Sequence, residues 1–160
     1  MDDNTDYYDS ISEGYNELHG EEQKKKLEII KAKLTVHRHD KMLDVGCGTG
    51  IALHFFDCFR VGIDPAYDLL KQSIHHPVQG FAEALPFRDK AFDIVISVTA
   101  VHNFADIEKG LEEIKRVGNN RFVITVLKKS SKAGEIDWFI RQMFSVKEIV
   151  DEEKDLIYLI

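Results

Sequence analysis

The chain has 160 residues, of which 44% are hydrophobic, and this length suits one compact domain with a buried core rather than two domains. Its formal net charge of −7 at pH 7 disfavours a nucleic-acid-binding protein, because the field of the whole molecule repels phosphates. Cys47 and Cys58 form neither a CxxC motif nor a metal-ligand spacing with histidine, which predicts reduced thiols, a cytoplasmic protein and no metal site. A run of about 20 apolar residues and a signal peptide are both missing, so a membrane protein is not expected.

The first element is an amphipathic helix over residues 21–34, because Leu27, Ile30 and Leu34 recur at three- and four-residue spacing. Its many lysines, Lys26 among them, are interpreted as a solvated face. In chain order we then expect a strand opening at 41, a helix over 49–59, a strand over 60–65, a helix over 66–74, a third strand before 80, a strand over 92–100, a helix over 106–117, a strand over 121–128, a helix over 135–144 and two strands around an acidic turn in 145–160.

This alternation of strands and helices predicts an α/β fold with a mainly parallel sheet and helices on both faces, because right-handed crossovers place the helices there. The last strand follows a tight turn, so it should be antiparallel to its neighbours. The whole chain, residues 1–160, is expected to be a single domain.

The stretch KMLDVGCGTG places Gly46, Gly48 and Gly50 directly after the first strand. In sheets of this kind ligands bind beyond the carboxyl ends of the strands, and glycines let a ligand approach the backbone. Asp64 ends the second strand, where a carboxylate accepts hydrogen bonds from both ribose hydroxyls, and Asp44 lies just ahead of the glycines. The alternative is a tight turn that holds no ligand.

The segments LDVGCGTG, VGIDPA and AEALPFRDKAFDIVIS resemble the consecutive motifs of class I S-adenosylmethionine-dependent methyltransferases of type 11. The resemblance runs from about Tyr7 to the C-terminus. It implies a Rossmann-like fold with a seven-stranded sheet, whose last strand is inserted antiparallel. It also implies S-adenosylmethionine as the cofactor and S-adenosylhomocysteine as the product.

Carried over to this sequence, the family's motifs imply that the glycine loop lines the methionine and ribose parts of the cofactor, that Asp44 faces the amino-acid part, and that Asp64 binds the ribose. Segment 1–23 would cover the cofactor through Tyr15. The full set of cofactor-binding residues implied by the resemblance is Tyr15, Asp44, Gly46, Cys47, Gly48, Gly50, Asp64, Pro65 (or Ala66 in its place), Ala82, Glu83, Ser97, Val98 and Thr99.

Phe81 departs from the family pattern, because many relatives carry an aspartate at this position. The acidic contact to the adenine amino group then falls to Glu83 or is missing. A dinucleotide is the competing ligand, but its usual motif is G-x-G-x-x-G and the chain has Ile51 where that spacing needs the third glycine. Asp44 would also repel a pyrophosphate, whereas it tolerates a sulfonium compound that carries an ammonium group.

His102, just past the end of the fourth predicted strand, is the candidate catalytic base, because imidazole takes up a proton near neutral pH. The interpretation that we favour from the sequence is structural: His102 and Asn103 open the following helix or pack under a loop. Methyl transfer needs a base only when the nucleophile arrives protonated.

The methyl acceptor is not identified by the sequence and is a small metabolite, RNA or protein. Missing after the fourth strand is the [DNS]-P-P-[YF] motif of enzymes that methylate exocyclic amines of bases or glutamine amides. An RNA contact would use Lys128, Lys129 and Lys132, although a solvated loop is the simpler interpretation. An activator subunit would use Trp138, Phe139 and Phe144, for which core packing is the simpler interpretation. The alternative function is a catalytically inactive cofactor-binding module that serves as a partner or scaffold.

Overall fold

The structure, a computed structural model, describes the backbone of residues 12–160 and the side chains of residues 20–160. Along the chain its elements are α2 (Ser12–Lys33), β1 (Lys41–Val45), the 3-10 turn η1 (Ala52–Phe55), β2 (Phe59–Asp64), α3 (Tyr67–Leu70), β3 (Pro77–Gln79), η2 (Ala82–Ala84), β4 (Phe92–Ser97), η3 (Val101–Asn103), α4 (Ile107–Val117), β5 (Gly118–Leu127), α5 (Ala133–Met143), β6 (Glu148–Asp151) and β7 (Asp155–Leu159).

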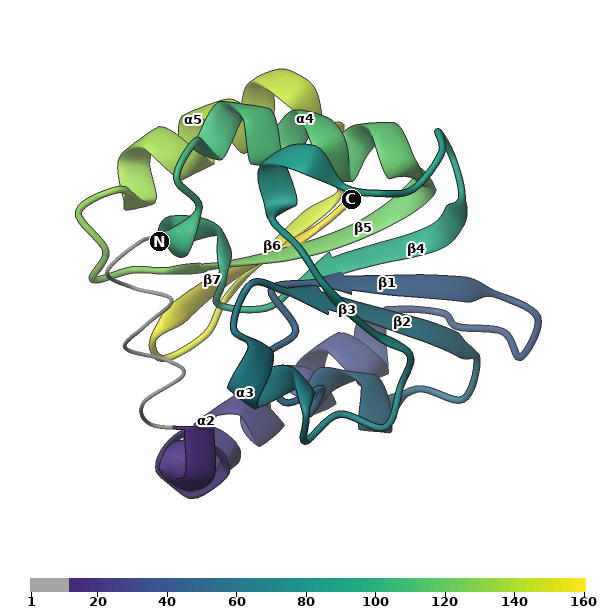
Figure 1. The fold of residues 1–160 in the computed structure, drawn as a ribbon. Helices are drawn as coiled ribbons and strands as arrows, with labels where there is room; N and C mark the ends of the chain where they lie inside the picture. The colour runs from purple at the N-terminus through teal and green to yellow at the C-terminus, as the bar shows by residue number, and fades with distance from the viewer. Residues whose placement is uncertain (1–11) are drawn as a thin grey trace.

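In the described part of the chain, seven strands form one sheet in the order β3-β2-β1-β4-β5-β7-β6 (Figure 1). Strands β1 to β5 pair in parallel with one another, whereas β7 pairs antiparallel with both β5 and β6. The mainly parallel sheet with an antiparallel last strand is therefore confirmed. The strand order reverses between β1 and β4, and in open α/β sheets this reversal marks the place where ligands bind.

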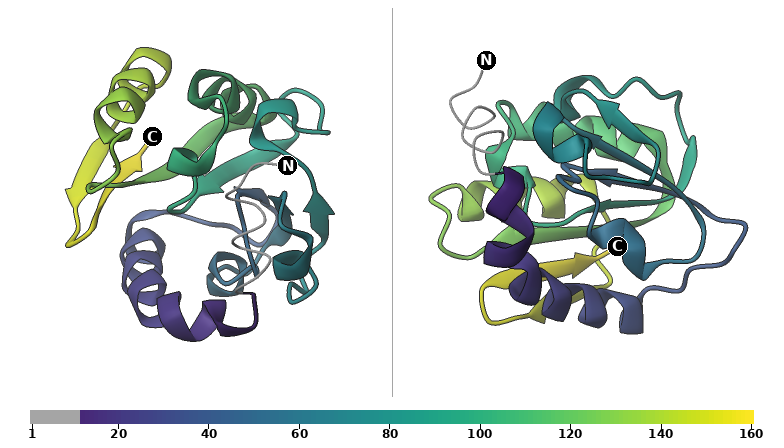
Figure 2. Two further views of the ribbon diagram at one scale, coloured as in Figure 1. Left: turned by 60° about the vertical axis from the view of Figure 1, so that its left-hand side comes forward. Right: turned by 60° about the horizontal axis from the view of Figure 1, so that its bottom comes forward.

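Apolar side chains of the sheet divide between its two faces. On one face they pack against α4 and α5, through residues such as Leu111 and Ile136. On the other face they pack against α2 and η1, through residues such as Leu27, Ile30 and Leu53. Figures 1 and 2 show α4 and α5 on one side of the sheet and α2 on the other. The expected helices on both faces are thus confirmed.

Two predicted helices are much shorter than expected. The segment 49–59 contains only the single turn η1, and the segment 66–74 contains only α3. Because β2 already begins at Phe59, the chain has too few residues after the glycines to complete a longer helix. The guanidinium of Arg60 donates to the carbonyl oxygens of Leu53 at 2.9 Å and Phe56 at 2.6 Å. It thereby supplies hydrogen-bond donors to carbonyl groups at the end of the short turn. Helix α2, in contrast, begins at Ser12 rather than at residue 21.

Asp40 and Arg121 form an ion pair at the end of the sheet opposite the glycine loop. The guanidinium donates two hydrogen bonds to the carboxylate, at 2.7 and 3.0 Å, and holds the pKa of Asp40 down at about 2. A carboxyl group with a lowered pKa contributes stability above pH 4, and that stability is lost as the pH falls towards 2.

Asp40→Asn is therefore expected to lower the free energy of unfolding by about 2 kcal/mol at pH 6, with the difference shrinking towards pH 2.5. Urea unfolding of both proteins at the two pH values measures this. Asp57→Asn is the matched control, because Asp57 pairs with Arg38 where both side chains are exposed and should change little. A loss of stability that does not depend on pH would contradict the assignment.

Candidate functional site

The glycine loop follows β1 and turns sharply against the ends of β2 and β4. Gly46 and Gly50 have φ values of +78° and +82°, in the left-handed region that favours glycine. A Cβ atom at Gly46 would lie 2.4 Å from the Cβ of Ala100, and one at Gly50 would lie 2.5 Å from the Oγ of Ser73. Both positions therefore require glycine, and the backbone of the loop stays accessible to a ligand.

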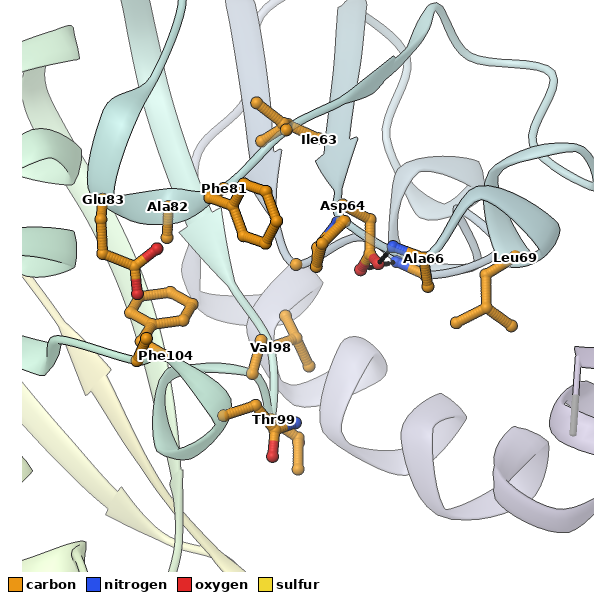
Figure 3. A pocket seen from close by; sticks show the side chains of 17 residues that line it. Ile63, Asp64, Ala66, Leu69, Phe81, Ala82, Glu83, Val98, Thr99 and Phe104 are labelled. Carbon is orange, nitrogen blue, oxygen red and sulfur yellow. Dashed lines mark hydrogen bonds between the residues drawn. The ribbon is translucent and has the colours of Figure 1, made fainter. Parts of the chain in front are cut away.

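A cavity lies beyond the carboxyl ends of β1, β2 and β4 and encloses about 800 Å³, its open mouth included. Asp64 and Ala66 lie on one side of it, and Ala82 and Glu83 on the other (Figure 3). Of the residues implied by the sequence, it brings together Gly46, Gly48, Asp64, Pro65, Ala82, Glu83, Val98 and Thr99.

A second, smaller cavity lies between the glycine loop and α2. Its lining includes Gln23 of α2, Asp44 and Cys47. Gly46 and Val98 line both cavities, which places the two side by side. An elongated ligand therefore has room on both sides of the first strand-to-helix turn.

Asp64 ties the glycine loop to the end of β2. Its side chain is nearly buried, and its two oxygens accept hydrogen bonds from the backbone N–H groups of Gly48 and Ala66, both at 2.8 Å. An ionised carboxylate only accepts hydrogen bonds, which suits the hydroxyl groups of a ligand. The carboxylate lines the larger cavity, where it is oriented before any ligand arrives.

Asp44 is buried beside the smaller cavity, and its Oδ1 atom has no hydrogen-bond partner within residues 20–160. Burial, together with the nearby charge of Asp64, raises the pKa of Asp44 to about 8. The carboxyl group is therefore mostly protonated at pH 7. A ligand ammonium group would supply both the missing donor and the missing positive charge.

The rim that carries Ala82 and Glu83 is fixed to α4. Glu83 accepts a hydrogen bond from the backbone N–H of Asp106, at 3.2 Å, just before that helix begins. Further on, Leu85 donates its N–H to Glu113 at 2.9 Å, and its carbonyl accepts from Arg116 at 3.1 Å. These contacts order the segment that follows β3, so Glu83 is held in place by the protein itself.

Several residues of the predicted set lie outside the two cavities. Ser97 is fully buried and donates to the carbonyl of Val45 at 2.8 Å, and Gly50 packs against Ser73. His102 lies in η3 and lines neither cavity. Tyr15 lies in α2, but its side chain is outside the described residues.

Other residues of the cavities were not identified from the sequence. Leu69 and Phe104 add apolar walls to the larger cavity, whose mouth also carries the half-exposed Phe81 noted above. They are ordinary apolar residues, so nothing in the sequence distinguishes them from core. Gln23 was also missed. It stands three residues before Lys26 and four before Leu27, on the same face of the helix. This spacing is the only sequence signal that places Gln23 toward the sheet.

The prediction that Lys26 belongs to a solvated face is wrong. Its side chain is fully buried and forms an ion pair with the equally buried Asp155 at the start of β7. Lys26 stands four residues before Ile30, so helical spacing puts it on the face that packs against the sheet.

Within the described part of the chain, no three His, Cys, Asp or Glu side chains are grouped so as to hold a metal ion. Nor does that part contain a helix long and apolar enough to span a membrane.

Comparison with known proteins gives a family match over residues 43–121, to a model described as a methyltransferase domain. An uncharacterized protein of Methanocaldococcus jannaschii is 29% identical over 144 residues, covering 86% of this chain and 55% of that protein. The uncharacterized methyltransferase YcgJ of Bacillus subtilis is 32% identical over 90 residues, covering 48% of this chain and 36% of YcgJ. This chain thus matches about half or less of the length of these relatives.

Among solved structures, a chain from the complex between the Haloferax volcanii Trm112 methyltransferase activator and a candidate methyltransferase superposes with a TM-score of 0.81. It is 18% identical, and the superposition covers 95% of this chain and 96% of that one. At this identity the likeness concerns the fold, and it extends over nearly the whole chain.

Proposed function

Because this chain belongs to the class I S-adenosylmethionine-dependent methyltransferases, we propose that it transfers a methyl group from S-adenosylmethionine to an acceptor at the carboxyl edge of its sheet. The observation that carries the proposal is the pair of adjoining cavities around Gly46, with Asp64 at the larger one and Asp44 at the smaller one. In this proposal the nucleoside occupies the larger cavity and the amino-acid group occupies the smaller one.

In this proposal Asp64 accepts hydrogen bonds from the ribose hydroxyls, and Pro65, Ala82 and Glu83 surround the adenine. Support comes from their positions around one cavity and from the backbone hydrogen bonds that hold the Asp64 carboxylate at its wall. Phe81 offers an exposed ring at the same mouth, which suits stacking against a base. The departure from the family's aspartate would then replace a polar contact with an apolar one.

Asp44 would receive the ammonium group of the methionine part, with Gly46, Gly48 and Cys47 along its length. The unpartnered Oδ1 of Asp44 supports this assignment. An ammonium group would stabilise the ionised form of Asp44 and a pyrophosphate would oppose it, which favours a compound that carries an ammonium group over a dinucleotide. Tyr15 and segment 1–23 are proposed to cover the cofactor, and Gln23 of α2 already lines the smaller cavity.

When bound, S-adenosylmethionine supplies an electrophilic methyl group and leaves as a neutral thioether. The protein's part is to hold an acceptor in line with the carbon–sulfur bond, and such positioning contributes up to about 7–11 kcal/mol for ideally aligned groups. Val98 lines both cavities and its neighbour Thr99 lines the larger one, so they would flank the reacting centre.

The acceptor is proposed to be a small metabolite, RNA or protein, in a cytoplasmic setting that suits the two free cysteines. An activator subunit is a further proposal. It is supported by the similarity to a chain solved with an activator and by exposed apolar side chains. Trp138 is exposed as that role requires, but Phe144 is buried in the core. Within residues 20–160, the other exposed large apolar side chains are Phe59, Tyr67, Ile74 and Phe81, around β2 and β3.

Titration of S-adenosylhomocysteine against thermal unfolding tests cofactor binding. The ligand at 100 times its dissociation constant is expected to add about 2.7 kcal/mol to the folded state. NAD at the same concentration is the control and should add nothing. A response to NAD alone would sink the proposal.

Labelled S-adenosylmethionine and a whole-cell extract separate an enzyme from a scaffold. We expect label on RNA, protein or small solutes, which would identify the acceptor class. Binding without any labelling, with and without co-expressed activator, would instead support the catalytically inactive module.

A further inference from the structure

A polar cluster is buried where α2, β4, β5 and β7 meet. Lys26 donates to the Oδ2 atom of Asp155 and, at 2.7 Å, to the hydroxyl of Thr99. That hydroxyl donates to the same carboxylate oxygen at 3.1 Å, and the backbone N–H of Thr99 donates to the hydroxyl of Thr125 at 2.7 Å. Lys26 and Asp155 are both fully buried. A buried ion pair is costly to desolvate, so core packing alone does not account for it.

The cluster adjoins the site described above through Thr99. This residue lines the larger cavity, and its neighbour Val98 lines both cavities. Thr99 also has a φ of +54°, a strained conformation for a β-branched residue. Hydrogen bonds to Asp155 and Thr125 hold it there, and strained residues of this kind gather at functional sites. The cluster therefore lies next to the proposed position of the reacting methyl group.

Two buried polar atoms of this region lack a hydrogen-bond partner within residues 20–160: the Oδ1 atom of Asp155 and the Nδ1 atom of His102. A carboxylate oxygen only accepts, so Asp155 lacks a donor. Leaving such an atom unpaired in the interior is unfavourable, and a ligand N–H or O–H group would remove the penalty.

We propose that Asp155 and His102 form the subsite for the methyl acceptor, and that the acceptor is a nitrogen or oxygen nucleophile that still carries a hydrogen. This inference rests on the proposed function. Asp155 Oδ1 accepts a hydrogen bond from the acceptor molecule and orients it. Lys26 and Thr99 act as positioning residues, because they fix the other oxygen of the same carboxylate.

The reaction is balanced with groups already present. The nucleophile's lone pair forms the new bond to the methyl carbon while the carbon–sulfur bond breaks, and its electron pair stays on sulfur. The proton of the N–H or O–H group passes to His102 Nδ1 and then to water. The structural roles favoured from the sequence, opening the following helix or packing under a loop, leave this buried ring nitrogen without a hydrogen-bond partner.

The charges around His102 suit a proton acceptor. Burial lowers the pKa of His102 below its usual value, Asp155 on β7 raises it, and Lys132 before α5 and Lys26 on α2 lower it. The imidazole is therefore neutral at pH 7 and ready to take a proton.

Two variants and one control test the subsite, using labelled S-adenosylmethionine with whole-cell extract. Asp155→Asn and His102→Gln are each expected to lower labelling at least 100-fold, while the affinity for S-adenosylhomocysteine stays within about twofold. His102→Gln keeps the Lys26–Asp155 pair, so it serves even where the other variant unfolds. Asp151→Asn on β6, where the carboxylate is exposed and pairs with Lys128, is the matched control and should label normally.

The labelled product should carry its methyl group on nitrogen or oxygen, as read by hydrolysis and mass spectrometry. A methyl group on carbon or on thiol sulfur would overturn the inference, as would full activity with an unchanged pH profile in His102→Gln. Absence of any response to S-adenosylhomocysteine in the wild type would instead remove the proposed function.

A crystal structure with S-adenosylhomocysteine decides the inference whether or not an acceptor is found. We expect a water molecule or acceptor group bonded to Asp155 Oδ1, on a path that opens to the larger cavity. A protein side chain that donates to that oxygen and closes the path would refute the subsite.

Discussion

Asp64→Ala is expected to lower the affinity for S-adenosylhomocysteine at least 100-fold. The variant removes a charged acceptor for two ribose hydroxyls, and hydrogen bonds to charged groups contribute about 1.5–3 kcal/mol each. It also frees the N–H groups of Gly48 and Ala66, which the carboxylate now holds at 2.8 Å. The glycine loop then loses its tie to β2. Thermal unfolding with increasing ligand measures the affinity.

Two controls separate the lost contact from a damaged fold. Asp64→Asn keeps the shape and one acceptor oxygen, so its affinity should fall between those of the wild type and Asp64→Ala. Asp68→Asn changes a partly exposed carboxylate on α3 and should leave the affinity unchanged. Equal affinity in Asp64→Ala and the wild type would remove Asp64 from the proposed site.

The strands were predictable from the sequence because their signal is local. Runs such as FDIVIS are apolar, β-branched and bounded by turn residues, and in the structure β4 is buried against both helical layers. The helix after the first strand was overestimated for a non-local reason. Its length is limited by where β2 must begin, and the position of β2 depends on its pairing with β1. Helix α3 ends at Leu70 although β3 begins only at Pro77, so strand position does not explain its length.

The same distinction applies to the site. Gly46 was predictable because only glycine tolerates both its φ of +78° and the approach of Ala100. The identity of the residue therefore indicates its backbone conformation. The ion pair of Lys26 and Asp155 was not predictable. One partner stands in a lysine-rich helix and the other in an acidic turn, and both segments have the composition of solvated surface. Only the packing of α2 against the end of the sheet brings them together.

Asp44 and Asp64 give the site a feature that neither has alone. The charge of Asp64 contributes to the raised pKa of Asp44, so the protein without a ligand keeps a proton on Asp44. A cation bound beside Asp44 would displace that proton. Cofactor binding is thereby coupled to pH through a single carboxyl group.

Asp44→Asn is expected to remove a pH dependence from the stability of the ligand-free protein. The pKa of Asp44 is raised to about 8, so between pH 5 and 7 the folded state holds one proton more than the unfolded chain. The stability of the wild type should therefore fall as the pH rises, by about 1.4 kcal/mol per pH unit. The variant cannot ionise there, so its stability relative to the wild type should rise by about 3 kcal/mol over this range. Urea unfolding at pH 5, 6 and 7 measures the slopes.

The same variant should bind S-adenosylhomocysteine more weakly and without proton release. In the wild type at pH 7, binding of the ammonium group is expected to release nearly one proton, which calorimetry detects as a difference between phosphate and Tris buffers. 5′-Methylthioadenosine lacks the amino-acid group and should release none from either protein. Equal proton release from the wild type and Asp44→Asn would show that another group titrates, and the ammonium group would then need a different partner in the smaller cavity.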